Sequence, residues 1–148
     1  MFHQVQVNEE HRDLLCFLLW EHGDTLKEPT EYRMTVNLFG ATSSPGCANL
    51  ALRTAADDGV EEFGVEAASF IKENFYVDVG LKSVPTAPEA IELIRNSTEM
   101  YLKGGFRLHK FTSNSKEVVE STPTESRAKD IKELDWTMTY FLPNVCLA

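Results

Sequence analysis

The stretch over residues 74–81 most constrains how this chain can fold. Apolar and polar side chains alternate along it, in the order Phe75, Tyr76, Val77, Asp78 and Val79. Such alternation gives an extended segment one apolar face and one polar face. Gly80 favours a type II turn over 78–81, at the position that needs a positive φ, and 81–84 can then return as a second strand. The sequence therefore predicts a β-hairpin that holds the carboxylate of Asp78 near its tip.

A carboxylate on a rigid tip suits a divalent cation, because hard cations prefer oxygen ligands in fixed geometry. An aspartate close to a glycine is, however, more often an ordinary turn residue. The hairpin alone leaves both interpretations of Asp78 open, and the rest of the chain has to decide between them.

Composition predicts one globular domain in a reducing compartment. The 148 residues are 43% apolar, which is enough for a packed core, and no apolar run is long enough to cross a bilayer. No basic segment precedes an apolar one as in a secretory signal. Cys16, Cys47 and Cys146 lack the spacing of a zinc site, which indicates reduced thiols. We therefore expect an intracellular, cytoplasmic protein without a membrane partner.

The charge balance is acidic, with 23 acidic against 14 basic residues and a net charge of −9. This balance disfavours nonspecific binding to nucleic acid, which depends on the neutralisation of phosphates. A local basic track on one face, or a place within a larger basic assembly, remains compatible with it.

The first third of the chain reads mainly as strands. Alternating or continuous apolar residues predict a strand over 1–7, a buried strand over 14–20 and a half-buried strand over 32–38, with a helical turn at 8–13. The small residues of 39–45 predict a loop through which backbone can approach a neighbour closely.

Helices follow. Helical spacing predicts one over 44–56, with Ser44 as its N-cap and Pro45 in its first turn, closed by residues 57–59. Others are expected over 65–74, over 87–103 after a capping box of Thr86 and Glu89, and near 126–134 on the surface. A last strand is expected over 106–111, with Lys110 on the same face as Phe106 and Leu108.

This order predicts an α+β fold in which helices pack on one face of a largely antiparallel sheet. The strand at 32–38 and the hairpin at Asp78 are expected in that one sheet, with the helices over 44–56 and 87–103 on the same face.

Three stretches together resemble reverse transcriptases. Residues 74–78 resemble the tyrosine-x-aspartate-aspartate hairpin, 38–45 the loop on the nucleotide side with its serine-proline helix start, and 104–111 the later strand that carries a lysine. The amino-acid sequence of residues 1–5, 39–45 and 113–115 is most similar to that of the BEL/Pao class of LTR retrotransposons. The resemblance covers about residues 1–120, and residues 121–148 read as an acidic linker, a short helix and a divergent tail.

The resemblance implies a polymerase palm with a ferredoxin-like core and RNA-directed DNA synthesis. Its cofactor would be Mg²⁺, used as a pair of ions in nucleotidyl transfer. Its partners would be a template-primer, an incoming dNTP and the other polyprotein domains: fingers, thumb, RNase H and integrase.

The resemblance also assigns roles to single residues. It makes Asp78 a metal ligand and catalytic residue, Lys110 the proton donor to pyrophosphate and Tyr76 a neighbour of the primer terminus. Phe2, Phe39 and Gly40 would line the nucleotide. Taken alone, Phe2 is more often an aromatic residue of the core or of a frayed chain end, and Lys110 a solvated strand end.

Two departures from the family pattern bear on activity. Val79 stands where the hairpin has its second aspartate, and the first-strand aspartate would fall roughly four residues before Met1 by strand spacing. One carboxylate of three remains, which is too few for two divalent ions. We therefore expect this chain by itself to be an inactive palm fragment. The alternative is a non-catalytic α+β binding or scaffolding module that keeps only the palm's shape.

Overall fold

The computed structural model describes residues 2–76, 78–128 and 145–147. Contacts divide the chain into two compact units, Met1–Asn49 and Leu50–Ala148. Helices and antiparallel strands alternate along the chain, so the predicted α+β class is confirmed.

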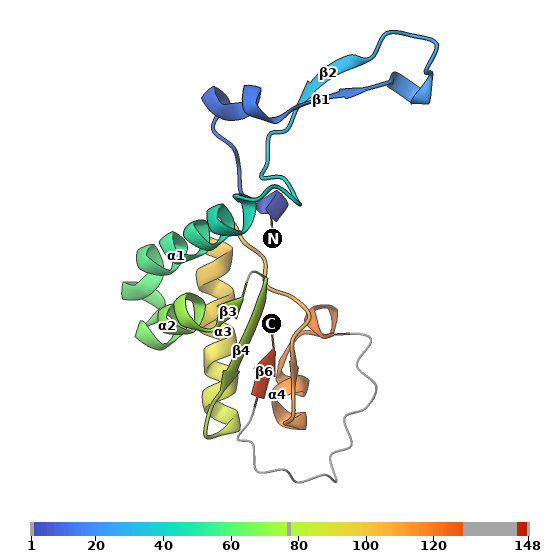
Figure 1. Cartoon of the computed structure of the whole chain (residues 1–148). Helices are drawn as coiled ribbons and strands as arrows, with labels where there is room; N and C mark the ends of the chain where they lie inside the picture. Colours follow the sequence, from blue (N-terminus) through green and yellow to red (C-terminus); the bar gives the residue numbers. More distant parts are fainter. Residues whose placement is uncertain (1, 77, 129–144, 148) are drawn as a thin grey trace. The chain divides into compact units, whose positions relative to one another are not determined.

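A two-stranded antiparallel ribbon dominates the first unit (Figure 1). Strand β1 (Cys16–Leu19) pairs with β2 (Thr30–Arg33), with Phe17 opposite Tyr32. A 3-10 helix at Glu9–Leu15 precedes the ribbon, where a helical turn was predicted over 8–13. Asn8 Oδ1 caps this helix by accepting a hydrogen bond from Glu10 N–H at 3.3 Å.

Three predictions about this unit need correction. The segment 1–7 is a 3-10 turn over Phe2–Gln4 followed by one antiparallel bridge between Gln6 and Val36. The strand inside 14–20 forms, but all four residues of β1 are exposed rather than buried. The strand inside 32–38 ends at Arg33. An apolar or alternating pattern indicates an extended segment but does not say what will cover it.

The second unit holds most of the helices. Helix α1 (Ser44–Phe63) begins in the first unit and continues into the second, where it is followed by α2 (Val65–Glu73), α3 (Ala87–Lys103) and α4 (Lys116–Ser121). The predicted capping box starts α3: Thr86 Oγ1 accepts from Glu89 N–H at 3.4 Å and donates to Glu89 Oε1 at 2.9 Å. The helix ends at Lys103, as predicted, and Gly104 is its C-cap.

The sheet of the second unit has the order β3-β4-β6-β5, and every neighbouring pair is antiparallel. Its strands are β3 (Phe75–Tyr76), β4 (Val79–Ser83), β5 (Thr112–Ser113) and β6 (Val145–Leu147). The ribbon of the first unit is a separate sheet. The prediction that the segment 32–38 and the hairpin share one sheet is therefore wrong.

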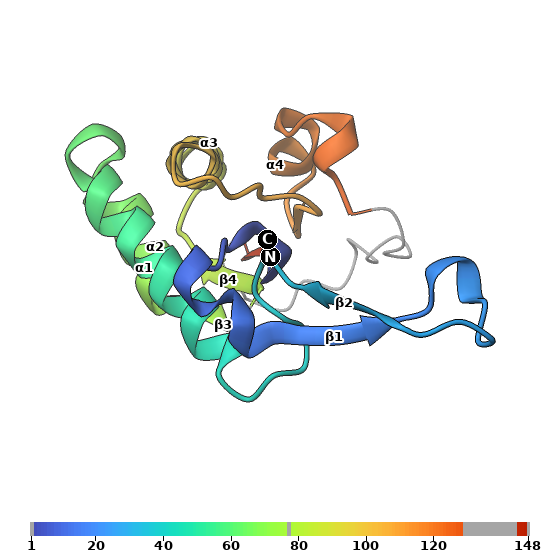
Figure 2. The same cartoon turned by 90° about the horizontal axis from the view of Figure 1, so that it is seen from above.

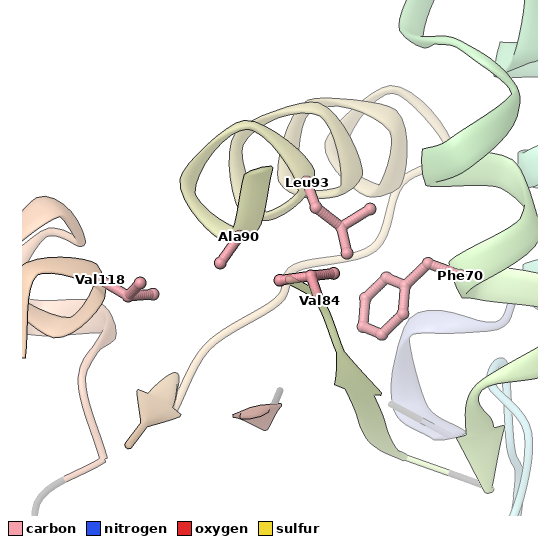
Figure 3. Close-up of a cluster of buried hydrophobic side chains, with 5 residues drawn as sticks. All are labelled: Phe70, Val84, Ala90, Leu93 and Val118. Carbon is pink, nitrogen blue, oxygen red and sulfur yellow. The ribbon is translucent and has the colours of Figure 1, made fainter. Parts of the chain in front are cut away.

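The core of the second unit joins three helices to the end of β4. Phe70 from α2, Ala90 and Leu93 from α3, and Val118 from α4 surround Val84, which follows β4 (Figure 3). Seen from above, α3 and α4 lie on the same side of β4 (Figure 2). This shared cluster holds the helices against the sheet.

Helix α1 runs past residues 57–59, where the sequence predicted its end. Gly59 is buried inside the helix, and a Cβ added there would lie 2.8 Å from Cγ of Met100 on α3. This glycine permits close packing of α1 and α3 instead of terminating the helix.

The strand predicted over 106–111 does not form as such. Residues 106–110 have no regular secondary structure, and Phe111 makes a single parallel bridge with Arg127. Phe106 and Leu108 are buried and Lys110 is exposed, so the predicted shared face is wrong as well. The helix predicted near 126–134 lies mostly outside the described residues.

Two buried hydroxyls on α3 have no hydrogen-bond partner among the described residues, those of Ser97 and Tyr101. Tyr101 is 2% exposed, and burial raises the pKa of its phenol. A buried hydroxyl without a partner costs free energy on folding.

We expect Tyr101→Phe to leave the free energy of unfolding unchanged or to raise it by up to about 1 kcal/mol at neutral pH. Because the raised pKa keeps the phenol neutral in the folded state, the wild type should lose up to about 1.4 kcal/mol per pH unit above about pH 10, where the unfolded chain ionises. Denaturation curves at several alkaline pH values measure this slope, which should shrink in Tyr101→Phe. The exposed Tyr76→Phe is the matched control, and an equal change in it would contradict this prediction.

Candidate functional site

The predicted hairpin forms, with Asp78 exposed where the chain reverses. Phe75 pairs with Gly80 and Tyr76 with Val79, so the reversal lies between Tyr76 and Val79. The N–H of Leu81 donates to the carbonyl of Asn74 at 3.0 Å, which extends the pairing toward the end of α2.

The predicted turn over 78–81 is wrong, because Gly80 belongs to β4 and does not have a positive φ. Its role is close packing: an added Cβ would lie 2.6 Å from the ring of Phe75. That ring lies 5.2 Å from the ring of Phe70 and 5.3 Å from that of Tyr101, between centroids. The base of the hairpin is thereby anchored in the core while its tip reaches solvent.

Tyr76 and Val79 face each other across the strands and are both exposed, by 84% and 51%. The hairpin tip therefore presents an aromatic side chain, an apolar side chain and the carboxylate of Asp78. Its surface is open to a ligand.

A second group of predicted residues lies in the first unit. The rings of Phe2 and Phe39 meet edge to face with their centroids 5.7 Å apart, and Phe39 is still 78% exposed. Gly40 has a φ of 92°, a conformation that favours glycine. The structure thus brings these three predicted residues into one local group.

A buried polar pair closes the loop that carries Phe39 and Gly40. Ser44 Oγ donates to Asn37 Oδ1 at 3.0 Å, and Asn37 Nδ2 donates to the carbonyl of Ser44 at 3.1 Å. Ser44 was predicted to be the N-cap of the helix. It is instead the first residue of α1, and its hydroxyl donates to Asn37. Asn37 gives no signal of this role in the sequence, because alternation places it on the polar face of the strand predicted over 32–38.

Lys110 is exposed and has a φ of 67°, which is uncommon for a residue with a side chain. The left-handed conformation interrupts the extended chain just before Phe111 bridges Arg127. Lys110, Tyr76 and Asp78 belong to the second unit, whereas Phe2, Phe39 and Gly40 belong to the first.

The described residues do not fit a site for two magnesium ions. No group of three or more His, Cys, Asp or Glu side chains in the described part of the chain is placed to hold a metal. At the hairpin tip Asp78 is followed by Val79, whose side chain offers no oxygen ligand.

No protein-family model, curated protein or solved structure matches the chain. Among the described residues, no helix is both long enough and apolar enough to cross a membrane.

Proposed function

We propose that this chain is a palm fragment of a reverse transcriptase from a BEL/Pao-like LTR retrotransposon, inactive as a polymerase on its own. The observation that carries the proposal is the antiparallel hairpin that anchors Phe75 in the core and exposes Asp78 at its tip. This is the arrangement that the resemblance of residues 74–78 to the polymerase hairpin requires.

The remaining residues take roles by the same resemblance. Phe39 and Gly40 form the wall for a nucleotide and Phe2 packs under its sugar, supported by the loop that carries Phe39 and Gly40 and by the ring contact between the two phenylalanines. Tyr76 faces the primer terminus, supported by its exposure beside Asp78. Lys110 donates a proton to the leaving group, supported only by its exposed position. In this proposal the natural setting is intracellular and cytoplasmic, with template-primer, dNTP and the other polyprotein domains as partners.

The inactivity follows from the composition of the hairpin tip. Magnesium keeps its waters unless several carboxylate and phosphate oxygens replace them together. Asp78 supplies one carboxylate and Val79 supplies none. The net charge of −9 adds repulsion against both template and dNTP.

A non-catalytic binding or scaffolding module is the second candidate. The replacement of an expected acid by Val79 favours it, because a module that binds without catalysis has no need of a metal pair. The two candidates differ in whether polymerase activity returns when the acids are restored.

Primer extension with Mg²⁺ or Mn²⁺ tests the proposal. We expect no template-dependent extension by the wild-type chain. Extension that disappears in Asp78→Asn would contradict the proposed inactivity and show that another acid, such as Glu9 or Glu10, completes the site.

The same assay then takes Val79→Asp in a chain extended at its N-terminus by a strand with an aspartate. Recovered extension supports the damaged polymerase. Continued inactivity, once fingers and thumb are supplied as separate domains, favours the scaffolding module.

A further inference from the structure

The β1–β2 ribbon has one face without any charged side chain. Residues directly opposite each other in an antiparallel pair share a face. Phe17 lies opposite Tyr32, and Leu19 lies opposite Thr30. These four residues, called here the neutral face, are all exposed, and the rings of Phe17 and Tyr32 stack with centroids 5.7 Å apart.

The other face is charged. Glu31 lies opposite Leu18, and Arg33 lies opposite Cys16. Arg33 makes ion pairs with Asp13 at 2.5 Å and with Glu31 at 3.0 Å. The two faces therefore differ: the four residues of the neutral face carry no charge, whereas the opposite face holds the ion pairs of Arg33.

An exposed ribbon of two strands is poorly stabilised by itself. Isolated hairpins are marginal in water and need a third strand or another layer to cover an apolar face. Contiguous exposed apolar side chains of this kind usually mark an interaction surface. Leu19, at the end of β1, is 50% exposed.

The charges around the ribbon decide which partner fits. Residues 16–33 hold four acidic and two basic side chains. Arg33 is paired as described above, and Lys27 pairs with Asp24 at 3.4 Å. Glu21 and Glu28 are exposed and make no ion pair with any described residue, and Glu21 Oε1 accepts a hydrogen bond from the Tyr32 hydroxyl at 3.4 Å. The uncompensated charge beside the neutral face is therefore negative.

We propose that the neutral face docks a basic polypeptide segment. Apolar side chains of that segment cover Phe17, Leu19 and Tyr32, and its lysines or arginines lie near Glu21 and Glu28. A nucleic acid or an anionic lipid would be repelled by these acids, and a second copy would bring the same acids together. This proposal does not depend on the polymerase resemblance.

Binding of labelled synthetic peptides to the full chain, followed by fluorescence anisotropy, tests the proposal. The probe is a peptide of alternating leucine and lysine. Two control peptides are used. One alternates leucine with glutamate, which removes the positive charge, and the other alternates serine with lysine, which removes the apolar face. We expect the leucine-lysine peptide to bind at least about tenfold more tightly than either control. Equal binding of the serine-lysine peptide would overturn the proposal, since net charge alone would explain it.

Variants of the chain locate the binding. Phe17→Ser combined with Tyr32→Ser should weaken binding of the leucine-lysine peptide about tenfold, whereas Leu102→Ser on α3, where the leucine is 67% exposed, should leave it unchanged. The double variant Glu21→Gln, Glu28→Gln keeps the four residues of the neutral face and should weaken binding several-fold. It therefore tests the proposal even if the serine variant misfolds. Binding that neither ribbon variant changes would overturn the proposal.

Two further measurements test whether a second copy of the chain or a lipid surface covers the neutral face instead. Sedimentation should find a monomer, and pelleting with phosphatidylcholine vesicles should leave the chain in solution. Self-association or vesicle binding that is lost in the Phe17→Ser, Tyr32→Ser variant would assign the neutral face to a second copy or to lipid, and would overturn the proposal.

Discussion

Phe70→Ala should lower the free energy of unfolding by about 3–5 kcal/mol. Phe70 is 4% exposed and lies in the cluster that joins α2, α3 and α4 to Val84. Its ring also meets that of Phe75 at the base of the hairpin. Truncation leaves a cavity that these neighbours cannot fill without breaking their other contacts, so the cost should fall in the upper range for core substitutions.

Chemical denaturation measures this loss. Tyr76→Ala is the matched control, because this aromatic residue of the same hairpin is exposed, and its cost should stay within about 0.5 kcal/mol. A loss below about 1 kcal/mol for Phe70→Ala would mean that the cluster does not hold the second unit together.

Gly80→Ala should lower the free energy of unfolding by about 1–3 kcal/mol, although it adds only a methyl group. The new Cβ would lie 2.6 Å from the ring of Phe75 and 3.0 Å from that of Phe70, so one ring or the strand has to move. Because Phe75 is held between Phe70 and Tyr101, its ring has little room to shift.

Gly46→Ala is the control for this substitution. Gly46 lies in α1, and an added Cβ would meet nothing within 4 Å. Alanine is the better helix former, so this variant should be as stable as the wild type or gain up to about 1 kcal/mol. If Gly80→Ala were equally harmless, the hairpin would not be packed as described.

Local patterns predicted the α+β class, the hairpin and the helices at α2 and α3. These elements have strong local signals: alternation around Asp78, helical spacing after Val65, and the capping box of Thr86 and Glu89 before α3. Such signals act within a few residues, so the sequence alone reveals them.

The wrong predictions concern contacts between residues that are distant in the sequence. A glycine can mark a turn or a close approach, and Gly59 and Gly80 both turned out to permit close packing. Apolar residues indicate an extended chain but not its cover, so β1 was predicted buried and is exposed. The sequence of strand β6 shows no hydrophobic periodicity that predicts a strand, and the position of β6 between β4 and β5 depends on long-range pairing.

For the candidate site, the sequence placed Asp78 at a hairpin tip but put the turn two residues too late. It identified Phe39 and Gly40 through the resemblance but missed Asn37, whose hydrogen bonds to Ser44 close their loop. A buried asparagine inside an alternating segment has no distinct local signal. The left-handed conformation of Lys110 was equally invisible, because no glycine marks it.

Titration with Mn²⁺, followed by electron paramagnetic resonance, tests most directly whether the hairpin is a polymerase metal site that has lost one acid. Val79→Asp should bind Mn²⁺ about tenfold more tightly than the wild type, because it adds a second carboxylate beside Asp78. Adding Asp78→Asn to that variant should remove the gain. Leu81→Asp, which adds the same charge to an exposed position further along β4, should give no comparable increase. An unchanged affinity in Val79→Asp, or a gain that survives Asp78→Asn, would contradict the account.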